Sequence, residues 1–121
     1  MDKRMEVLKK ILITHPHNEI PNLPLADQLE FARKGAYLEH CFAVTTPMFF
    51  NARIQDLVEA IRKAGPDRCV LASDLGQVCN PSPVEGLRIF ILGLMSLGIT
   101  REEIDTMVRK NPTKLLGLDE E

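Results

Sequence analysis

Short β-rich runs alternate with longer helical stretches along this chain, and the alternation is the feature that most restricts its fold. Three runs are predicted to be strands: residues 11–14, 36–42 and 69–72. Strands that alternate with helices pair in parallel through right-handed crossovers. The sequence therefore predicts an α/β protein with about three parallel strands and five to six helices.

The expected helices are marked by capping residues and by apolar residues at helical spacing. Asn51, Ser82, Thr100 and Asn111 are each in a position to cap a helix start, because their short polar side chains accept from free backbone N–H groups. Gly35 stands where a left-handed residue would end a helix. The expected segments are residues 3–9, 24–34, 51–64, 83–97, 100–110 and 111–117.

Composition limits the class of protein. The chain has 121 residues, 45% of them hydrophobic, which suits one domain spanning residues 1–121. Its net charge of −2 lacks the basic footprint of nucleic-acid binders. The longest apolar stretch, residues 89–97, is too short for a membrane span, and the charged N-terminus does not look like a signal peptide. The three cysteines show no CxxC spacing. We therefore expect a cytoplasmic protein that binds neither membrane nor nucleic acid.

Each predicted strand runs into a polar side chain that metals accept. His15 ends the first strand, Glu39 and His40 end the second, and Asp74 follows the third. The carboxyl ends of parallel strands meet at one edge of a sheet, where active sites gather. Imidazole and carboxylate groups suit zinc, manganese or iron, and a carboxylate can accept a proton from metal-bound water. The pattern predicts a site in which His15, His40 and Asp74 converge, with His17 and Glu39 as secondary candidates.

Structural roles compete with each of these assignments. His15 is about as well explained as a packed, hydrogen-bonded histidine, and His17 is better explained as a solvated loop residue. Glu39 and His40 are adjacent in a strand and face opposite sides, so only one of them can enter the site without a bulge; we favour His40. Asp74 has the alternative of bonding its own turn.

The segment before the fourth expected helix is a candidate for substrate contact. Backbone N–H groups at a helix start attract phosphate or carboxylate groups, and the run Asn80-Pro81-Ser82-Pro83 opens such a helix. Because Ser82 already uses some of these donors, we expect a contribution to substrate binding rather than a separate anion site. Gln77 and Asn80 are the expected contact side chains.

Two segments resemble the C-terminal end of amidohydrolase-superfamily TIM barrels, including the TatD-like and decarboxylase-like branches. The first is residues 69–76, a strand ending in Ser-Asp, and the second is residues 111–118, which read NP-x-x-LLGL. Residues 13–16 and 38–40 also resemble the histidine-bearing middle strands of these barrels. The similarity extends from about residue 10 to residue 118.

The resemblance implies a function as well as a fold. In that superfamily the middle histidines bind metal or contact substrate, and the late Asp binds metal and handles the proton of the attacking water. By position, His15 and His40 would be the histidines and Asp74 the metal-binding and catalytic Asp. The implied activity is hydrolysis of a small-molecule amide, ester or phosphoester with a divalent metal, zinc or manganese.

The sequence departs from these barrels in length. Three strands cannot close an eight-stranded barrel, and four or five earlier strands, the first with a His-x-His pair, are missing. We therefore expect an incomplete barrel layer that is either a fragment or pairs with another chain, with self-association through a strand edge or through residues 89–97. The alternative function is a non-catalytic assembly or binding domain that keeps the fold.

Overall fold

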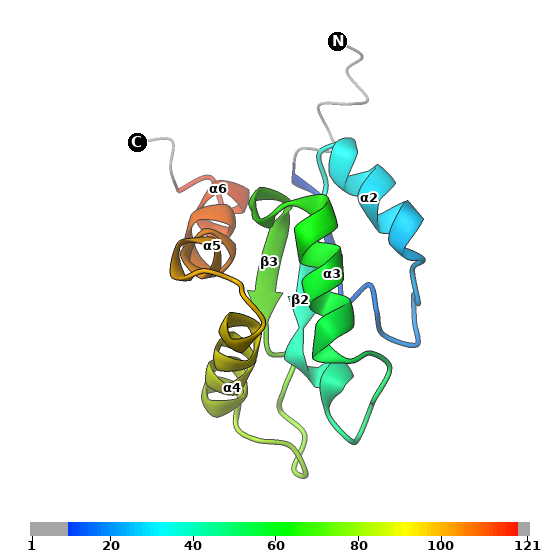
Figure 1. Cartoon of the computed structure of the whole chain (residues 1–121), viewed down its shortest axis with the longest axis vertical. Helices are drawn as coiled ribbons and strands as arrows, with labels where there is room; N and C mark the ends of the chain where they lie inside the picture. The colour runs from blue at the N-terminus through cyan, green and yellow to red at the C-terminus, as the bar shows by residue number, and fades with distance from the viewer. Residues whose placement is uncertain (1–9, 119–121) are drawn as a thin grey trace.

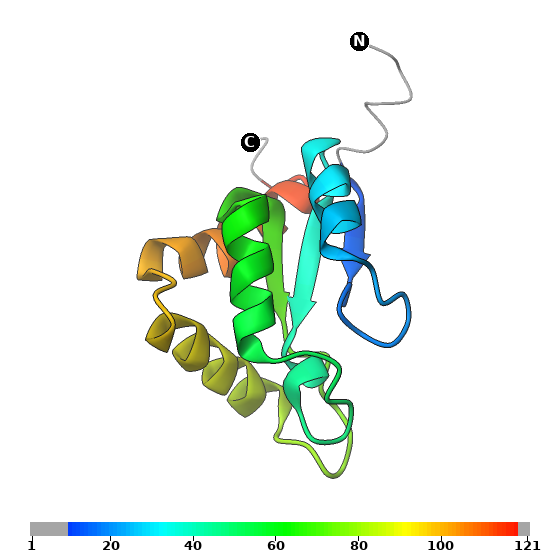
Figure 2. The same ribbon diagram turned by 45° about the vertical axis from the view of Figure 1, so that its right-hand side comes forward.

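The computed structural model describes residues 10–118, which form an open sheet of three parallel strands. The strands are β1 (Leu12–Thr14), β2 (Tyr37–Cys41) and β3 (Cys69–Ala72), in the spatial order β1-β2-β3. All three run in the same direction; Figure 1 shows β2 and β3, and Figure 2 shows all three arrows. The prediction of an α/β protein with about three parallel strands is confirmed.

The helices follow the strands in the expected alternation. Two short turns of 3-10 helix, η2 and η3, flank β2 and β3, and a turn of π-helix, η4, links the last two α-helices. The expected helix over residues 3–9 lies outside the described residues. The described helical segments are α2 (Leu25–Arg33), η2 (Phe42–Thr45), α3 (Ile54–Ala64), η3 (Pro66–Arg68), α4 (Pro83–Ser96), α5 (Arg101–Asp105), η4 (Thr106–Lys110) and α6 (Asn111–Leu115).

Several predicted helix ends are confirmed by their hydrogen bonds. Gly35 has a φ of +102° directly after α2, and its N–H donates to the Ala32 carbonyl, as expected of a left-handed helix end. The Ser82 hydroxyl accepts from the Glu85 N–H at the start of α4. Thr100 begins α5 with a full capping box.

The start of α3 differs from the prediction. Asn51 does not cap this helix, which begins three residues later at Ile54. The backbone N–H groups of Asn51 and Ala52 donate to the Val44 carbonyl, which holds this stretch against the end of β2 and delays the first helical turn. The first turn is stabilised instead by Asp56, whose carboxylate accepts from the Arg53 N–H at 2.8 Å.

The C-terminal helices also differ from the prediction. Asn111 does not cap a separate helix, because its backbone is helical and continues η4 into α6. Its side chain is buried and donates to the carbonyls of Cys69 at 2.7 Å and Pro66 at 2.9 Å. Asn111 therefore ties the C-terminal helices to the start of β3.

Helices α2 and α3 cover one face of the sheet, and α4 to α6 flank it beside β3, as Figures 1 and 2 show. Leu38 on β2 is fully buried within the main apolar cluster. The same cluster contains residues from α2, α3, β3 and α4. They include Ala32, Leu57, Ile61, Leu71, Phe90 and Leu94.

The three loops that leave the carboxyl ends of the strands lie at one end of the molecule, at the arrowheads in Figure 1. They connect β1 to α2, β2 to α3 and β3 to α4. In parallel α/β folds this end carries the functional groups. Within residues 10–118, no helix has the length and apolar character needed to cross a membrane.

Candidate functional site

The side chains of β2 divide between the two faces of the sheet. Successive residues of a strand point to opposite faces, so Glu39 and Cys41 share one face while Leu38 and His40 share the other. Leu38 packs in the apolar cluster beneath α2 and α3. His40 therefore points toward the helices, and Glu39 points away from them.

Glu39 and its neighbours form a polar cluster on the face away from α2 and α3. The Thr14 hydroxyl on β1 donates to Glu39 Oε1 at 2.5 Å. The Cys41 thiol lies 3.7 Å from the same oxygen. Asp74, which follows β3, is also close enough to act electrostatically on Cys41. Two carboxylates from neighbouring strands thus lie near one buried thiol.

The environment of Cys41 keeps its thiol protonated. Burial is the largest cause, followed by the negative charges of Glu39 and Asp74, and together they raise the pKa of Cys41 to about 12. Hydrogen bonds from the His15 backbone and from Thr14 oppose this rise only partly. Because the thiolate is the reactive form of cysteine, Cys41 is not a nucleophile in this arrangement.

His15 stands at the carboxyl end of β1 with a constrained backbone. Its N–H donates to the Glu39 carbonyl at 2.9 Å, which extends the β1–β2 pairing by one residue. Its φ is +34°, a value that residues other than glycine rarely adopt. The ring is half-buried, and its Nδ1 atom is buried without a hydrogen-bond partner. The structure places His15 at the predicted edge of the sheet.

His40 and His17 form a separate pair beneath the helices. His40 is completely buried, and its ring centroid lies 5.7 Å from that of His17 in the β1–α2 loop. Burial and the neighbouring His17 lower the pKa of His40 to about 3. Burial also lowers the pKa of His17, although attraction to Asp56 on α3 opposes this. Both imidazoles are therefore neutral at pH 7.

Asp74 begins an exposed loop that also contains Gln77 and Asn80. Asp74 has a φ of +52°, which sets the turn that leads away from β3. Gln77 Nε2 donates to the Asp74 carbonyl at 3.2 Å, and Asn80 Nδ2 donates to Gln77 Oε1 at 3.0 Å. The two candidate contact residues thus support each other beside Asp74.

The expected metal set of His15, His40 and Asp74 does not fit one ion in this arrangement. Asp74 lies near Cys41 on one face of the sheet, and His40 is packed on the other face. Among residues 10–118, no group of three or more His, Cys, Asp or Glu side chains is placed to hold a metal. The structure places Glu39 and Asp74 each near Cys41, and it places the ring of His17 beside that of His40.

Sequence reasoning did not select Cys41 or Thr14 as members of the cluster. A signal for Cys41 was present, because it is two residues from Glu39 in the same strand and must share its face. Thr14 precedes His15 directly, and its hydroxyl became relevant only through the register that places it opposite Glu39.

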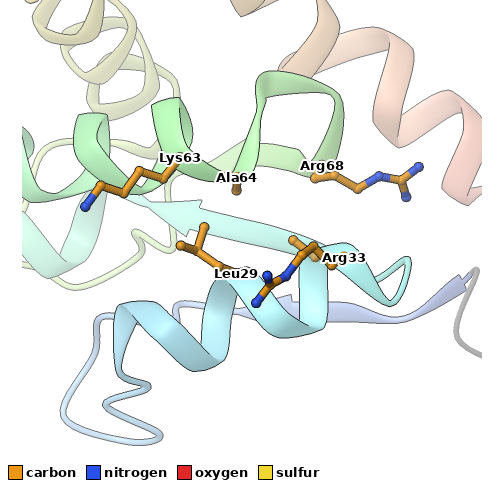
Figure 3. Close-up of a pocket in the computed structure, with 6 residues that line it drawn as sticks. Leu29, Arg33, Lys63, Ala64 and Arg68 are labelled. Carbon is orange, nitrogen blue, oxygen red and sulfur yellow. The ribbon is translucent and has the colours of Figure 1, made fainter.

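A pocket of about 400 Å³ lies between α2 and α3, away from these residues. It contains three cationic side chains, Arg33, Lys63 and Arg68, but Figure 3 shows Lys63 and Arg68 pointing away from each other. Lys63 pairs with Glu59, and Arg68 donates to the Gly35 carbonyl. Cations at helix C-termini also offset the helix dipole. These side chains have local roles, so we do not place the site here.

The geometry thus defines a polar cluster at the carboxyl edge and a histidine pair beneath the helices. Comparisons of the whole chain with protein-family models and with curated proteins both found no match.

Proposed function

We propose that this chain is the C-terminal part of an amidohydrolase-like β/α barrel whose hydrolytic site is complete only when further strands join its sheet. The observation that carries the proposal is the clustering of Glu39 and Asp74 around Cys41 at the carboxyl edge. A carboxylate in such a position is able to accept a proton from an attacking water. We assign this role to Asp74, with a small-molecule ester, amide or phosphoester as substrate.

The divalent metal of the proposed reaction, zinc or manganese, requires ligands beyond the expected three. His15, His40 and Asp74 do not meet, so these three side chains do not form the metal site by themselves. Asp74 and Glu39 are the carboxylates that this chain offers to the site. Gln77 and Asn80 lie beside Asp74, where they are placed to contact substrate.

The flanks of the layer support its assembly with further strands. Within the described residues, β1 and β3 each pair only with β2, so each has an open edge. Beside β1 an apolar groove includes Ile11, Ile13 and Phe31. On the other flank, α4 exposes Val84 and Leu92, the latter by 58%. Uncovered strand edges and apolar helix faces favour pairing with another chain.

Assembly can be tested by light scattering. We expect the purified chain to self-associate at micromolar concentration, and Leu92→Glu on α4 to shift it toward the monomer, because a carboxylate on an apolar interface is costly to bury. Arg101→Glu, a matched new carboxylate on exposed α5, should leave the mass unchanged. A parent chain that is monomeric throughout would rule out self-association as the source of the further strands.

Hydrolysis can be tested with the assembled protein, zinc or manganese, and chromogenic esters, amides and phosphoesters. Asp74→Asn should lower the rate by about 100-fold or more, because it removes the proposed proton acceptor. Asp105→Asn is a matched control, since Asp105 at the end of α5 forms an ion pair with Arg109 of η4 and is not part of the proposed site. The proposal fails if Asp74→Asn and Asp105→Asn behave alike, or if the parent hydrolyses no substrate of the three classes.

A second candidate is a non-catalytic assembly or binding domain. It is favoured by the position of His40, which is packed away from the two carboxylates. In that case the parent should assemble but neither retain stoichiometric metal nor hydrolyse any substrate, and Asp74→Asn should assemble equally well. Elemental analysis of the purified protein separates the two candidates.

A further inference from the structure

Within residues 10–118, the edge of the sheet at β1 is open and has backbone groups to offer to another strand. Figure 2 shows β1, in blue, at the outer edge of the sheet beside α2. The Ile11 carbonyl and the His15 N–H bond to β2. Because alternate residues of a strand turn their backbone groups to opposite neighbours, Leu12 and Thr14 turn theirs to the open side. The Leu12 side chain is also 40% exposed.

An apolar groove of about 290 Å³ runs along this edge on the helix side of the sheet. Ile13 borders the groove, since it is in register with Leu38 and packs against the main apolar cluster. An apolar groove beside an open strand is a surface on which another chain can pack. The other apolar residues that line it are Ile11, Pro21, Leu23, Phe31 and Ala36.

The flank of α2 beside the groove carries a charge pattern that complements itself. Asp27, Phe31 and Lys34 are exposed and are spaced four and three residues apart, so they share one side of the helix. Phe31 and Lys34 line the groove, whereas Arg33 lines the pocket toward α3. Lys34 pairs with Glu30 at 2.6 Å, and its ammonium has further donors. An acidic end, an aromatic centre and a basic end match a second copy of the same flank when the two copies run antiparallel.

We propose that two copies of this chain form a dimer by antiparallel pairing of β1 with β1 about a two-fold axis. Leu12 and Thr14 of each copy exchange backbone hydrogen bonds with Thr14 and Leu12 of the other. Asp27 of each α2 faces Lys34 of the second copy, with the two Phe31 side chains between these ion pairs. The two sheets become one continuous sheet, and both copies of α2 lie on the same face of it.

The dimensions of the strand and helix layers agree with this arrangement. Paired strands lie ~4.8 Å apart. Because α2 connects β1 to β2 across one face, the two copies of α2 lie two strand spacings apart, roughly 10 Å. That separation is within the range at which helices pack. Ile13, at the middle of β1, and Phe31, at the middle of the α2 pattern, line the same groove, so one axis serves both layers.

The dimer would also regulate the proposed hydrolase, and this consequence alone rests on the proposed function. Further barrel strands would have to join β1 in parallel. A second copy joins it antiparallel, so the carboxyl edge of that copy lies at the opposite end of the sheet. The dimer therefore occupies the β1 edge without completing the rim around Glu39 and Asp74, and it holds the chain in a resting form.

Analytical ultracentrifugation of the full chain carrying Leu92→Glu tests the proposal, because that substitution removes association through α4. We expect this protein to form a dimer at micromolar concentration. Adding Lys34→Glu should raise the dimer dissociation constant about 10-fold or more, since two-fold symmetry replaces two ion pairs with two pairs of facing carboxylates. Arg33→Glu makes the same change of charge on the opposite flank of α2 and should leave the constant unchanged.

Exchange of the two charges gives a further comparison in the same background. Asp27→Lys alone should weaken the dimer as Lys34→Glu does, and the two substitutions together should restore it, because the ion pairs form again with reversed polarity. Amide exchange at Leu12 and Thr14 should slow when the dimer forms.

Three results would overturn the proposal. They are a monomeric Leu92→Glu protein, which leaves the β1 edge to a different chain, equal effects of Lys34→Glu and Arg33→Glu, and a double variant no tighter than the single ones. Unprotected amides at Leu12 and Thr14 in a dimer would exclude the strand pairing. All of these results are independent of the hydrolysis assay, so failure of the dimer and failure of the proposed activity are told apart.

Discussion

Replacing Asn111 with leucine is expected to lower the free energy of unfolding by about 2–4 kcal/mol. The Asn111 amide is 1% exposed and donates to two backbone carbonyls, those of Pro66 and Cys69. Leucine has a similar volume but no donor, so both carbonyls lose a partner in a buried environment. Urea unfolding followed by circular dichroism measures the change.

Lys114→Ala on the same helix is the control, because Lys114 is exposed and its replacement should change stability by less than about 0.5 kcal/mol. Equal urea midpoints for Asn111→Leu and the parent would mean that these two hydrogen bonds do not hold the C-terminal helices to β3. The expected loss instead assigns Asn111 a structural role.

The strands were predicted to within one residue at each end. They are short β-rich runs whose neighbours break the pattern, and parallel pairing follows from the helices between them. The helix starts were predicted less well. Ser82 and Thr100 cap as expected, since their partners Glu85 and Glu103 lie three residues away in the sequence. The predicted caps Asn51 and Asn111 were wrong, because their hydrogen bonds depend on distant segments.

The division of Glu39 from His40 was predictable, because adjacent strand residues face opposite sides. Which face would be covered by helices was not, since that depends on how α2 and α3 pack. The chemistry of imidazole favoured His40 as a metal ligand at the edge. The structure places His40 on the same packed face as Leu38, and the β2 side chains on the opposite face are Glu39 and Cys41.

The same burial makes His40 a source of acid sensitivity. Its pKa is about 3 in the folded state, below the ordinary value of 6.5 that the unfolded chain approaches. The unfolded state therefore takes up a proton that the folded state resists. The contribution of neutral His40 is fully present above about pH 6.5 and is lost as the pH falls toward 3.

His40→Leu is expected to remove this contribution. The measurements are made in buffer that contains a metal chelator. Between about pH 7.5 and pH 4.5, the free energy of unfolding should fall by about 2–3 kcal/mol more for the parent than for the variant, because leucine has no site to protonate. At neutral pH the variant should be at least as stable as the parent, since it replaces two unpartnered buried nitrogens with an apolar group of similar size. Urea unfolding at each pH measures both differences.

Comparison with the parent separates the histidine contribution from that of the carboxylates that respond to acid. The pKa values of Asp56, Glu103 and Asp105 are lowered by their hydrogen bonds, and these carboxylates destabilise the parent and the variant equally as they protonate. Parallel pH profiles for parent and variant would show that the His40 ring takes up its proton as readily in the folded state as in the unfolded state.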